Sequence, residues 1–355
     1  MSTGQPAVDF QSVSKRYGRV TAVDAVSFTI ASATLVTLLG PSGCGKTTTL
    51  RLIAGLERAS SGRILIGGRE VTPLPAADRN VSMVFQSYAL FPHMNVLENV
   101  CYGLRASGVD RRRAEQMAAA KLELVGLKAF ERRLPSELSG GQQQRVAVAR
   151  AIVLEPEVLL FDEPLSNLDA KLRRHVREEI RALQQDLRLT VVYVTHDQHE
   201  ALAVSDRIIV MNHARIAQDG TPRELYEQPC TRFVADFIGD SNLLAATIRR
   251  TEAAMAEVQL GTLTLCLPHR GAPDGPAELS ARPEAIRLLP AGNGLRGHVL
   301  KAAYLGSHME YEIALEGQTG EIFVVHPDIA SPIPPGTEVG VAFDESGLAI
   351  VPPES

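Results

Sequence analysis

The chain has 355 residues, a formal net charge of −5, 45% hydrophobic and 22% charged residues, and no tryptophan. This composition is typical of a soluble globular protein with enough material for two or three cores. It excludes an intrinsically disordered chain, a collagen-like repeat and a disulfide-stapled scaffold. The four cysteines lie far apart without a Cys-x-x-Cys pair. That spacing favours a reducing compartment and offers no metal-ligand pattern.

One early segment has the length of a membrane span. Residues 25–45 carry no charge over 21 positions, which is about the length of a bilayer-crossing helix. Hydroxyl side chains interrupt this segment, however, and a turn rich in glycine and proline ends it. The alternation between Val26 and Ile30 and the apolar run Leu35–Leu39 therefore predict strands. The N-terminus has neither a basic start nor an apolar stretch, so no secretion signal is expected.

The C-terminal third differs from the rest of the chain in charge and proline content. Residues 241–355 hold 7 basic and 14 acidic residues and 11 of the 21 prolines, whereas residues 1–240 are close to neutral. Such a change predicts a domain boundary, with domains at 1–240 and 241–355. Neither part has the dense basic face that a nucleic-acid partner requires, so no such partner is expected.

The two parts also differ in their patterns of apolar residues. Residues 1–240 alternate strand-like runs with helical patterns, which is typical of an α/β domain. Strands are predicted at 35–39, 81–85, 158–161, 190–195 and 208–211, the last of the set, and helices at 47–55, 111–130, 142–154 and 170–187. The tail has short apolar stretches, mostly separated by glycine and proline, at 246–248, 258–260, 263–267, 286–289, 299–300, 311–315, 321–325 and 339–343. This pattern predicts a small all-β domain, an OB-like barrel or a sandwich.

A glycine-rich run between a predicted strand and a predicted helix fits the pattern G-x-x-x-x-G-K-[ST]. Its glycines let backbone N–H groups wrap a phosphate, and the helix N-terminus adds its dipole. Lys46 is expected to reach the β- and γ-phosphates, and Thr47 to place its hydroxyl on Mg²⁺. The alternative is a glycine-rich turn with a chance lysine, which the strand–turn–helix context disfavours. The predicted ATP-binding residues of this run are Gly40, Pro41, Ser42, Gly43, Cys44, Gly45, Lys46, Thr47 and Thr48.

Polar side chains follow three other predicted strands. Asp162 and Glu163 come after the apolar run 158–161, at the edge where α/β sheets bind ligands. We expect Asp162 to hold Mg²⁺ and Glu163 to polarise the attacking water. His196 follows the strand at 190–195 and is expected to contact the γ-phosphate and orient this water. Gln86 follows 81–85 and is expected to contact Mg²⁺ or the same water. A solvated strand end and a structural histidine are the competing interpretations.

Residues 138–142 read Leu-Ser-Gly-Gly-Gln directly before a predicted helix. Alone, this run indicates only a helix cap, but together with the preceding motifs it makes the chain resemble the ATP-binding subunits of ABC transporters. The 20 residues from Gln142 to Asp162 are similar to the family's spacing. The resemblance implies a P-loop NTPase cassette that pairs head-to-tail with a second copy. The signature residues that would then act on the partner's ATP are Leu138, Ser139, Gly140, Gly141 and Gln142.

Other residues match elements of this family one by one. Tyr17 resembles the aromatic residue that stacks on adenine, Gln86 the Q-loop glutamine and His196 the switch histidine. The run Ser166-Asn167-Leu168-Asp169 resembles the D-loop, of which Ser166 and Asp169 are the expected site residues. The resemblance implies ATP hydrolysis with Mg²⁺, whose expected ligands are Thr47, Gln86 and Asp162.

The same resemblance assigns a helical subdomain to residues 87–157. Within it, the residues expected near the groove that docks on two membrane-spanning permease subunits are Phe91, Pro92, His93 and Met94. The implied location is peripheral, on the cytoplasmic face of the inner membrane. A solute-binding protein is an indirect partner in this arrangement.

The tail narrows the resemblance to one group of importers. Arg282 begins a run, Arg-Pro-Glu-Ala-Ile, that resembles the C-terminal β-barrel domain of importer ATPases for sugars, polyamines, sulfate and ferric iron. Residues 203–206 and 237–243 look most like the ferric-iron import ATPases and their phosphonate-type relatives. The expected cargo is therefore ferric iron, and phosphonate, polyamine and sugar stay open because the solute does not contact this chain. A ligand or regulator of the tail is likewise open.

Two soluble classes of ATPase share parts of this pattern. Chromosome- or repair-associated ATPases carry a long coiled coil between the phosphate loop and the signature. Here only 91 residues without a heptad run separate Lys46 from Leu138, which disfavours that class. A translation-type cassette protein would need a second phosphate loop, which the sequence lacks.

Overall fold

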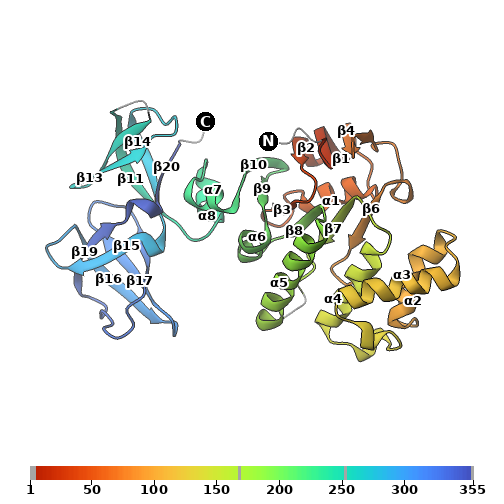
Figure 1. Cartoon of the computed structure of the whole chain (residues 1–355). Coiled ribbons are helices and arrows are strands. Elements are labelled where there is room, and N and C mark those ends of the chain that lie inside the picture. The colour runs from red at the N-terminus through yellow and green to blue at the C-terminus, as the bar shows by residue number, and fades with distance from the viewer. Residues whose placement is uncertain (1–4, 167–168, 252–253, 353–355) are drawn as a thin grey trace. The chain divides into compact units, whose positions relative to one another are not determined.

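The computed structural model describes residues 5–166, 169–251 and 254–352. The chain forms two compact units, one up to Pro222 and one from Arg223 onward, and each is described by itself (Figure 1). The change in composition near residue 240 lies inside the second unit. The helices of the described ranges lack the combination of length and apolar character that crossing a membrane requires.

A six-stranded sheet in the order β10-β9-β3-β8-β7-β6 forms the centre of the first unit. The strands are β3 (Leu35–Leu39), β6 (Val81–Val84), β7 (Val158–Asp162), β8 (Val191–Thr195), β9 (Arg207–Asn212) and β10 (Arg215–Gly220). All pairs are parallel except β10 with β9. Every residue of β3 and β8 is buried, as in a parallel sheet covered on both faces.

The expectation that 208–211 is the last strand of this set is wrong. β10 follows β9 after a short turn and pairs with it at the edge of the sheet. Its sequence, Arg-Ile-Ala-Gln-Asp-Gly, has no fully buried residue. An edge strand of this kind lacks the apolar run by which the central strands are recognised.

A second sheet, in the order β2-β1-β4-β5, is antiparallel. It consists of β1 (Val8–Tyr17), β2 (Val20–Ile30), β4 (Ser61–Ile66) and β5 (Arg69–Glu70). Helix α1 (Lys46–Ala54) shares one core with this sheet and with the six-stranded sheet, through Leu50, Leu52 and Ile53. The helix that carries Lys46 is therefore fixed between two sheets.

The helices of the other core of this unit follow the order of the chain. They are α2 (Val96–Ala106), α3 (Arg111–Leu124), α4 (Gly140–Ile152), α5 (Ala170–Leu187) and α6 (Gln198–Val204). Figure 1 shows α2, α3 and α4 grouped beside the six-stranded sheet, between β6 and β7 along the chain. The helix expected at 111–130 ends at Leu124, because Gly126 turns left-handed (φ 73°) and only a short 3-10 turn, Lys128–Phe130, follows.

The second unit begins with short helices and continues as an all-β domain, as predicted. The helices are α7 (Pro222–Glu227), which begins at the last residue of the first unit, and α8 (Arg232–Phe237). One antiparallel sheet contains β11 (Asn242–Arg250), β12 (Met255–Leu260), β13 (Leu263–Pro268), β14 (Gly275–Ala281) and β20 (Leu348–Val351). The other contains β15 (Ile286–Pro290), β16 (Leu295–Tyr304), β17 (Met309–Leu315), β18 (Glu321–His326) and β19 (Glu338–Phe343). One hydrophobic core joins the two sheets.

Candidate nucleotide-binding and catalytic site

The glycine-rich loop lies between the buried strand β3 and helix α1. Two of its glycines sit where no side chain fits. A Cβ atom on Gly40 would come within 2.2 Å of the carbonyl oxygen of Met211, and one on Gly45 within 2.3 Å of that of Ala22. Gly45 also has φ of 107°, which other residues rarely adopt. The backbone can therefore curl tightly and present its N–H groups at the start of α1.

Lys46 lies at the centre of this loop with only 5% of its surface exposed. Its ammonium group donates hydrogen bonds to the carbonyl oxygens of Gly40 (2.7 Å) and Pro41 (2.9 Å). The sulfur of Cys44 lies 3.9 Å from the same nitrogen, and burial raises the pKa of this thiol. All four cysteines of the chain lie in the described ranges and are free. A phosphate at this loop would meet a cation that is already inside its curve.

Asp162 ends β7, next to β8 and close to the phosphate loop. Burial raises the pKa of Asp162, and the negative charge of Glu163 acts in the same direction. The positive charges of Arg51 and Lys46 and a hydrogen bond from Thr47 lower it. Thr47 and Asp162 thus place a hydroxyl and a carboxylate side by side, and oxygen ligands of this kind suit Mg²⁺.

Glu163 follows immediately and turns the chain sharply, with φ of 46°. Its N–H donates to Val194 of the neighbouring β8 (3.0 Å), and its Oε2 lies 3.3 Å from Nδ1 of His196. Ser166 donates a hydrogen bond to the carbonyl oxygen of Glu163 (3.0 Å) and accepts one from the amide of Gln86 (3.0 Å). The residues that follow β6, β7 and β8 therefore meet at one edge of the sheet.

A network that the motif analysis missed supports His196. The carboxylate of Glu200 is buried and accepts hydrogen bonds from Thr195 (2.8 Å) and Tyr193 (3.2 Å). Burial raises the pKa of Glu200, while these hydroxyls lower it. Thr195 in turn accepts the N–H of Asp197, and Arg173 of α5 pairs with Asp197 at 3.2 Å. The residues on both sides of His196 are therefore fixed.

One sequence signal for part of this network was available. Asp197 caps α6 by accepting the N–H of Glu200, three residues later, at 3.0 Å. An aspartate followed by a glutamate at this spacing is a recognised helix start. The burial of Glu200 against Tyr193 has no such signal, because it depends on how α6 packs on β8.

Ser139 is the N-cap of α4, and its side chain forms a capping box with Gln142. The Ser139 hydroxyl accepts the N–H of Gln142 (3.4 Å), and the Gln142 side chain accepts the N–H of Ser139 (3.0 Å). Leu138 is buried, whereas Ser139 stays exposed. Among the described residues, no hydrogen bond or ion pair joins residues 138–142 to the phosphate loop. The helix-cap interpretation thus describes this chain's own contacts.

Three groups of predicted residues lie outside the carboxylate cluster. Asp169 caps α5 by accepting the N–H of Leu172 (2.9 Å), while Asn167 and Leu168 lie outside the described residues. Tyr17 ends β1 and is 46% exposed, with the ammonium of Lys15 4.7 Å from its ring centre. The β1–β2 hairpin that carries Tyr17 also supplies the Ala22 carbonyl at Gly45.

The predicted docking residues lie in the segment between β6 and α2. The ring centre of Phe91 is 4.5 Å from that of Tyr102 on α2 and 6.2 Å from that of His93. Tyr102 is 47% exposed. An aromatic surface is therefore present there, and its docking role stays a prediction.

Comparisons with known proteins agree with this geometry. A family model described as ABC transporter matches residues 23–166, and one described as TOBE domain matches residues 279–350. The chain is 57% identical to the Fe(3+) ions import ATP-binding protein FbpC 1 of Rhizobium meliloti strain 1021, and 58% identical to FbpC of Brucella abortus strain 2308. Each alignment covers 97% of this chain and 98% of the relative. The protein of the same name from Photorhabdus laumondii is 48% identical over 89% of this chain and 90% of its own length.

Proposed function

The chain belongs to the ATP-binding proteins of ABC transporters, and we propose that it hydrolyses ATP at the edge of its six-stranded sheet to drive the import of ferric iron. The observation that carries the proposal is the convergence, at this edge, of a buried lysine, a hydroxyl–carboxylate pair and a carboxylate–histidine pair. The cargo is inferred from the relatives' names, since no residue of the site indicates it.

In the proposed reaction the loop N–H groups and Lys46 bind the β- and γ-phosphates. Thr47 and Asp162 would hold Mg²⁺, with the side-chain oxygen of Gln86 as a further ligand, and the hydrogen bond between the first two fits this role. When bound there, Mg²⁺ would neutralise phosphate charge that develops during transfer. An oxygen-rich pair of this kind is the donor set that Mg²⁺ prefers.

Glu163 is the proposed general base. Its carboxylate is partly buried and lies 3.3 Å from His196, which is more exposed and can turn toward a phosphate. We propose that Glu163 accepts the proton of the attacking water and that His196 orients this water against the γ-phosphate. The Gln86–Ser166–Glu163 chain of hydrogen bonds would report the state of this site to the segment after β6. Tyr17 would stack on the adenine ring.

The proposed working form is a head-to-tail dimer that contacts two permease subunits on the cytoplasmic face of the membrane. Ser139 is exposed at the N-terminus of α4, so a partner's nucleotide can reach the N–H groups of that helix. Glu163→Gln should keep ATP bound and trap the dimer, because the base is lost while the binding loop is intact. Light scattering with ATP and Mg²⁺ should show twice the monomer mass, and a monomer would contradict the dimer.

Uptake of radiolabelled ferric iron tests the transport function. Cells that lack their own copy of this subunit are supplied either with the chain or with Glu163→Gln. We expect uptake with the former and background uptake with the latter, since hydrolysis drives the import. Equal uptake in both would contradict iron as the cargo. The same cells would then be tested with labelled phosphonate, polyamine and sugar.

A further inference from the structure

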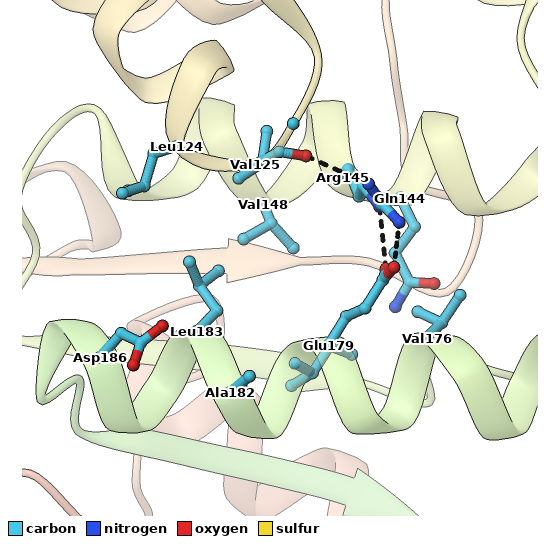
Figure 2. A pocket seen from close by; sticks show the side chains of 12 residues that line it. Leu124, Val125, Gln144, Arg145, Val148, Val176, Glu179, Ala182, Leu183 and Asp186 are labelled. Atoms are coloured by element: carbon cyan, nitrogen blue, oxygen red, sulfur yellow. Dashed lines mark hydrogen bonds and ion pairs between the residues drawn. The ribbon is translucent and has the colours of Figure 1, made fainter.

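A pocket with a volume of about 320 Å³ lies between α4 and α5, away from the catalytic residues (Figure 2). Its walls are largely apolar. Val148 of α4 and Leu183 of α5 point toward each other across it, and Val176, Ile180 and the end of α3 complete the lining. This volume lies within the range of pockets that hold small molecules.

Gln144 of α4 is the unusual member of this lining. Its side chain extends from α4 toward α5 and is 99% buried (Figure 2). Neither its amide nitrogen nor its amide oxygen has a hydrogen-bond partner among the described residues. Because a buried amide without partners is costly, native proteins rarely keep one unless something satisfies it.

The charges around the pocket restrict what can satisfy this amide. Arg145 forms an ion pair with Glu179 across the two helices and also donates to the carbonyl oxygen of Val125 (Figure 2). Asp186 adds a second carboxylate at the exposed edge. The only cation of the lining is thus already paired, so an anion would meet excess negative charge.

We propose that this pocket binds a small, uncharged, largely apolar molecule that carries a lactam-like group. A lactam presents its N–H and its C=O on one edge. It can therefore donate to the oxygen of Gln144 and accept from its nitrogen at the same time. The apolar body would contact the valine, leucine and isoleucine side chains. A carboxylate cannot donate to the Gln144 oxygen and would be repelled by Glu179 and Asp186.

The position of the pocket links it to hydrolysis, a consequence that rests on the proposed function. α4 begins at Ser139 and α5 at Asp169, so the pocket lies between the helices that follow these two predicted site segments. A second hollow of about 230 Å³ shares Arg145, Val176 and Glu179 with it and is also lined by Ser139 and Gln142. A bound molecule would hold α4 against α5 and so oppose movement of the signature relative to the sheet.

Titration of the full chain with 2-quinolone tests the binding. N-methyl-2-quinolone is the matched probe, since it keeps the apolar body and loses the N–H donor. We expect 2-quinolone to shift NMR signals of α4 and α5 and to bind about 3- to 10-fold more tightly than the methylated probe. Gln144→Leu should weaken binding of 2-quinolone and remove the difference between the probes.

Two alanine variants control for the pocket itself. Ala182→Phe, at the exposed edge of the lining, should block both probes, whereas Ala120→Phe, on the exposed face of α3 outside the lining, should leave binding unchanged. Absence of binding at millimolar 2-quinolone would overturn the proposal and leave water as the partner of Gln144. Equal affinity for the two probes, or binding that Gln144→Leu does not change, would also overturn it.

The rate of ATP hydrolysis at saturating 2-quinolone tests the link to catalysis. We expect a several-fold lower rate for the natural chain and no change for Gln144→Leu. An unchanged rate in the natural chain would overturn the link. Binding is measured without nucleotide, so a chain that binds 2-quinolone but never hydrolyses ATP would contradict the proposed function instead.

Discussion

A buried ammonium group held only by carbonyl oxygens gains more from an arriving anion than one paired with a carboxylate. Lys46 is of the first kind. It contacts the carbonyls of Gly40 and Pro41, and no carboxylate of the described residues lies within ion-pair distance of its nitrogen. Dipoles keep the charge tolerable in a buried place without neutralising it. A phosphate in the loop would supply the missing negative charge.

Lys46→Ala should therefore weaken ATP binding about 10- to 100-fold, which is the effect of losing a charged hydrogen bond. Isothermal titration with a non-hydrolysable ATP analogue measures this change. Lys128→Ala is the matched control, because Lys128 is exposed and pairs only with Glu123 on the surface. If Lys46→Ala bound the analogue as tightly as the natural chain, the phosphate assignment would be wrong.

Among the elements, the central strands were the easiest to predict from sequence. β3, β7 and β8 are short apolar runs, because a parallel sheet buries both faces. The order in which they pair places Asp162 opposite Val194, and so brings Glu163 next to His196. The prediction that these strand ends share one edge followed from the same rule.

Other elements escaped prediction because their residues face water or mix polar with apolar positions. β1 and β4 lie in the antiparallel sheet and are exposed along part of their length, and β10 is an edge strand. The buried Glu200 and Gln144 could not be found either. Each looks like an ordinary polar residue of a helix, and only the packing of α6 on β8 or of α4 on α5 buries it.

Asp206 connects three elements of the first unit. It pairs with Arg181 of α5 at 2.5 Å and accepts the N–H of Leu35 at the start of β3, directly before β9. Burial alone would raise the pKa of Asp206, but the hydrogen bonds from Arg181 and from Leu35 lower it below its ordinary value. A lowered pKa means that this group stabilises the fold above its unfolded-state pKa, and that the stabilisation is lost as pH falls through the folded-state pKa.

Asp206→Asn should lower stability at pH 7 by about 1 kcal/mol, since the pair is only partly buried and water screens it. The difference between the two proteins should shrink as the pH falls below 4, where the natural chain also loses its charge. Thermal unfolding of both proteins from pH 3 to pH 7 measures it. Glu123→Gln, which removes the exposed pair with Lys128, should change stability little at any pH. A difference that grows toward acid would contradict the assignment.

At the scale of the whole molecule, each unit has its own hydrophobic core, so the units can unfold separately. Arg282, which stood out in the sequence only as part of a family run, has a physical role in the second unit. It is 97% buried, and its guanidinium lies 4.1 Å from the ring centre of Tyr226. It also donates to the carbonyl oxygens of Tyr226, Ala235, Gly239 and Asp240. One side chain thus fixes the α7–α8 segment onto the β-strands.

Arg282→Met should therefore destabilise the second unit alone, by at least about 3 kcal/mol, because several buried carbonyl oxygens lose their donor while the volume is kept. Scanning calorimetry with and without ATP separates the units, since ATP should raise only the transition of the first. The Arg282→Met transition that moves down should be the one that ATP does not shift. Arg287→Met is the control, because Arg287 is exposed and pairs with Asp344. A loss confined to the ATP-sensitive transition would show that Arg282 supports the cassette instead.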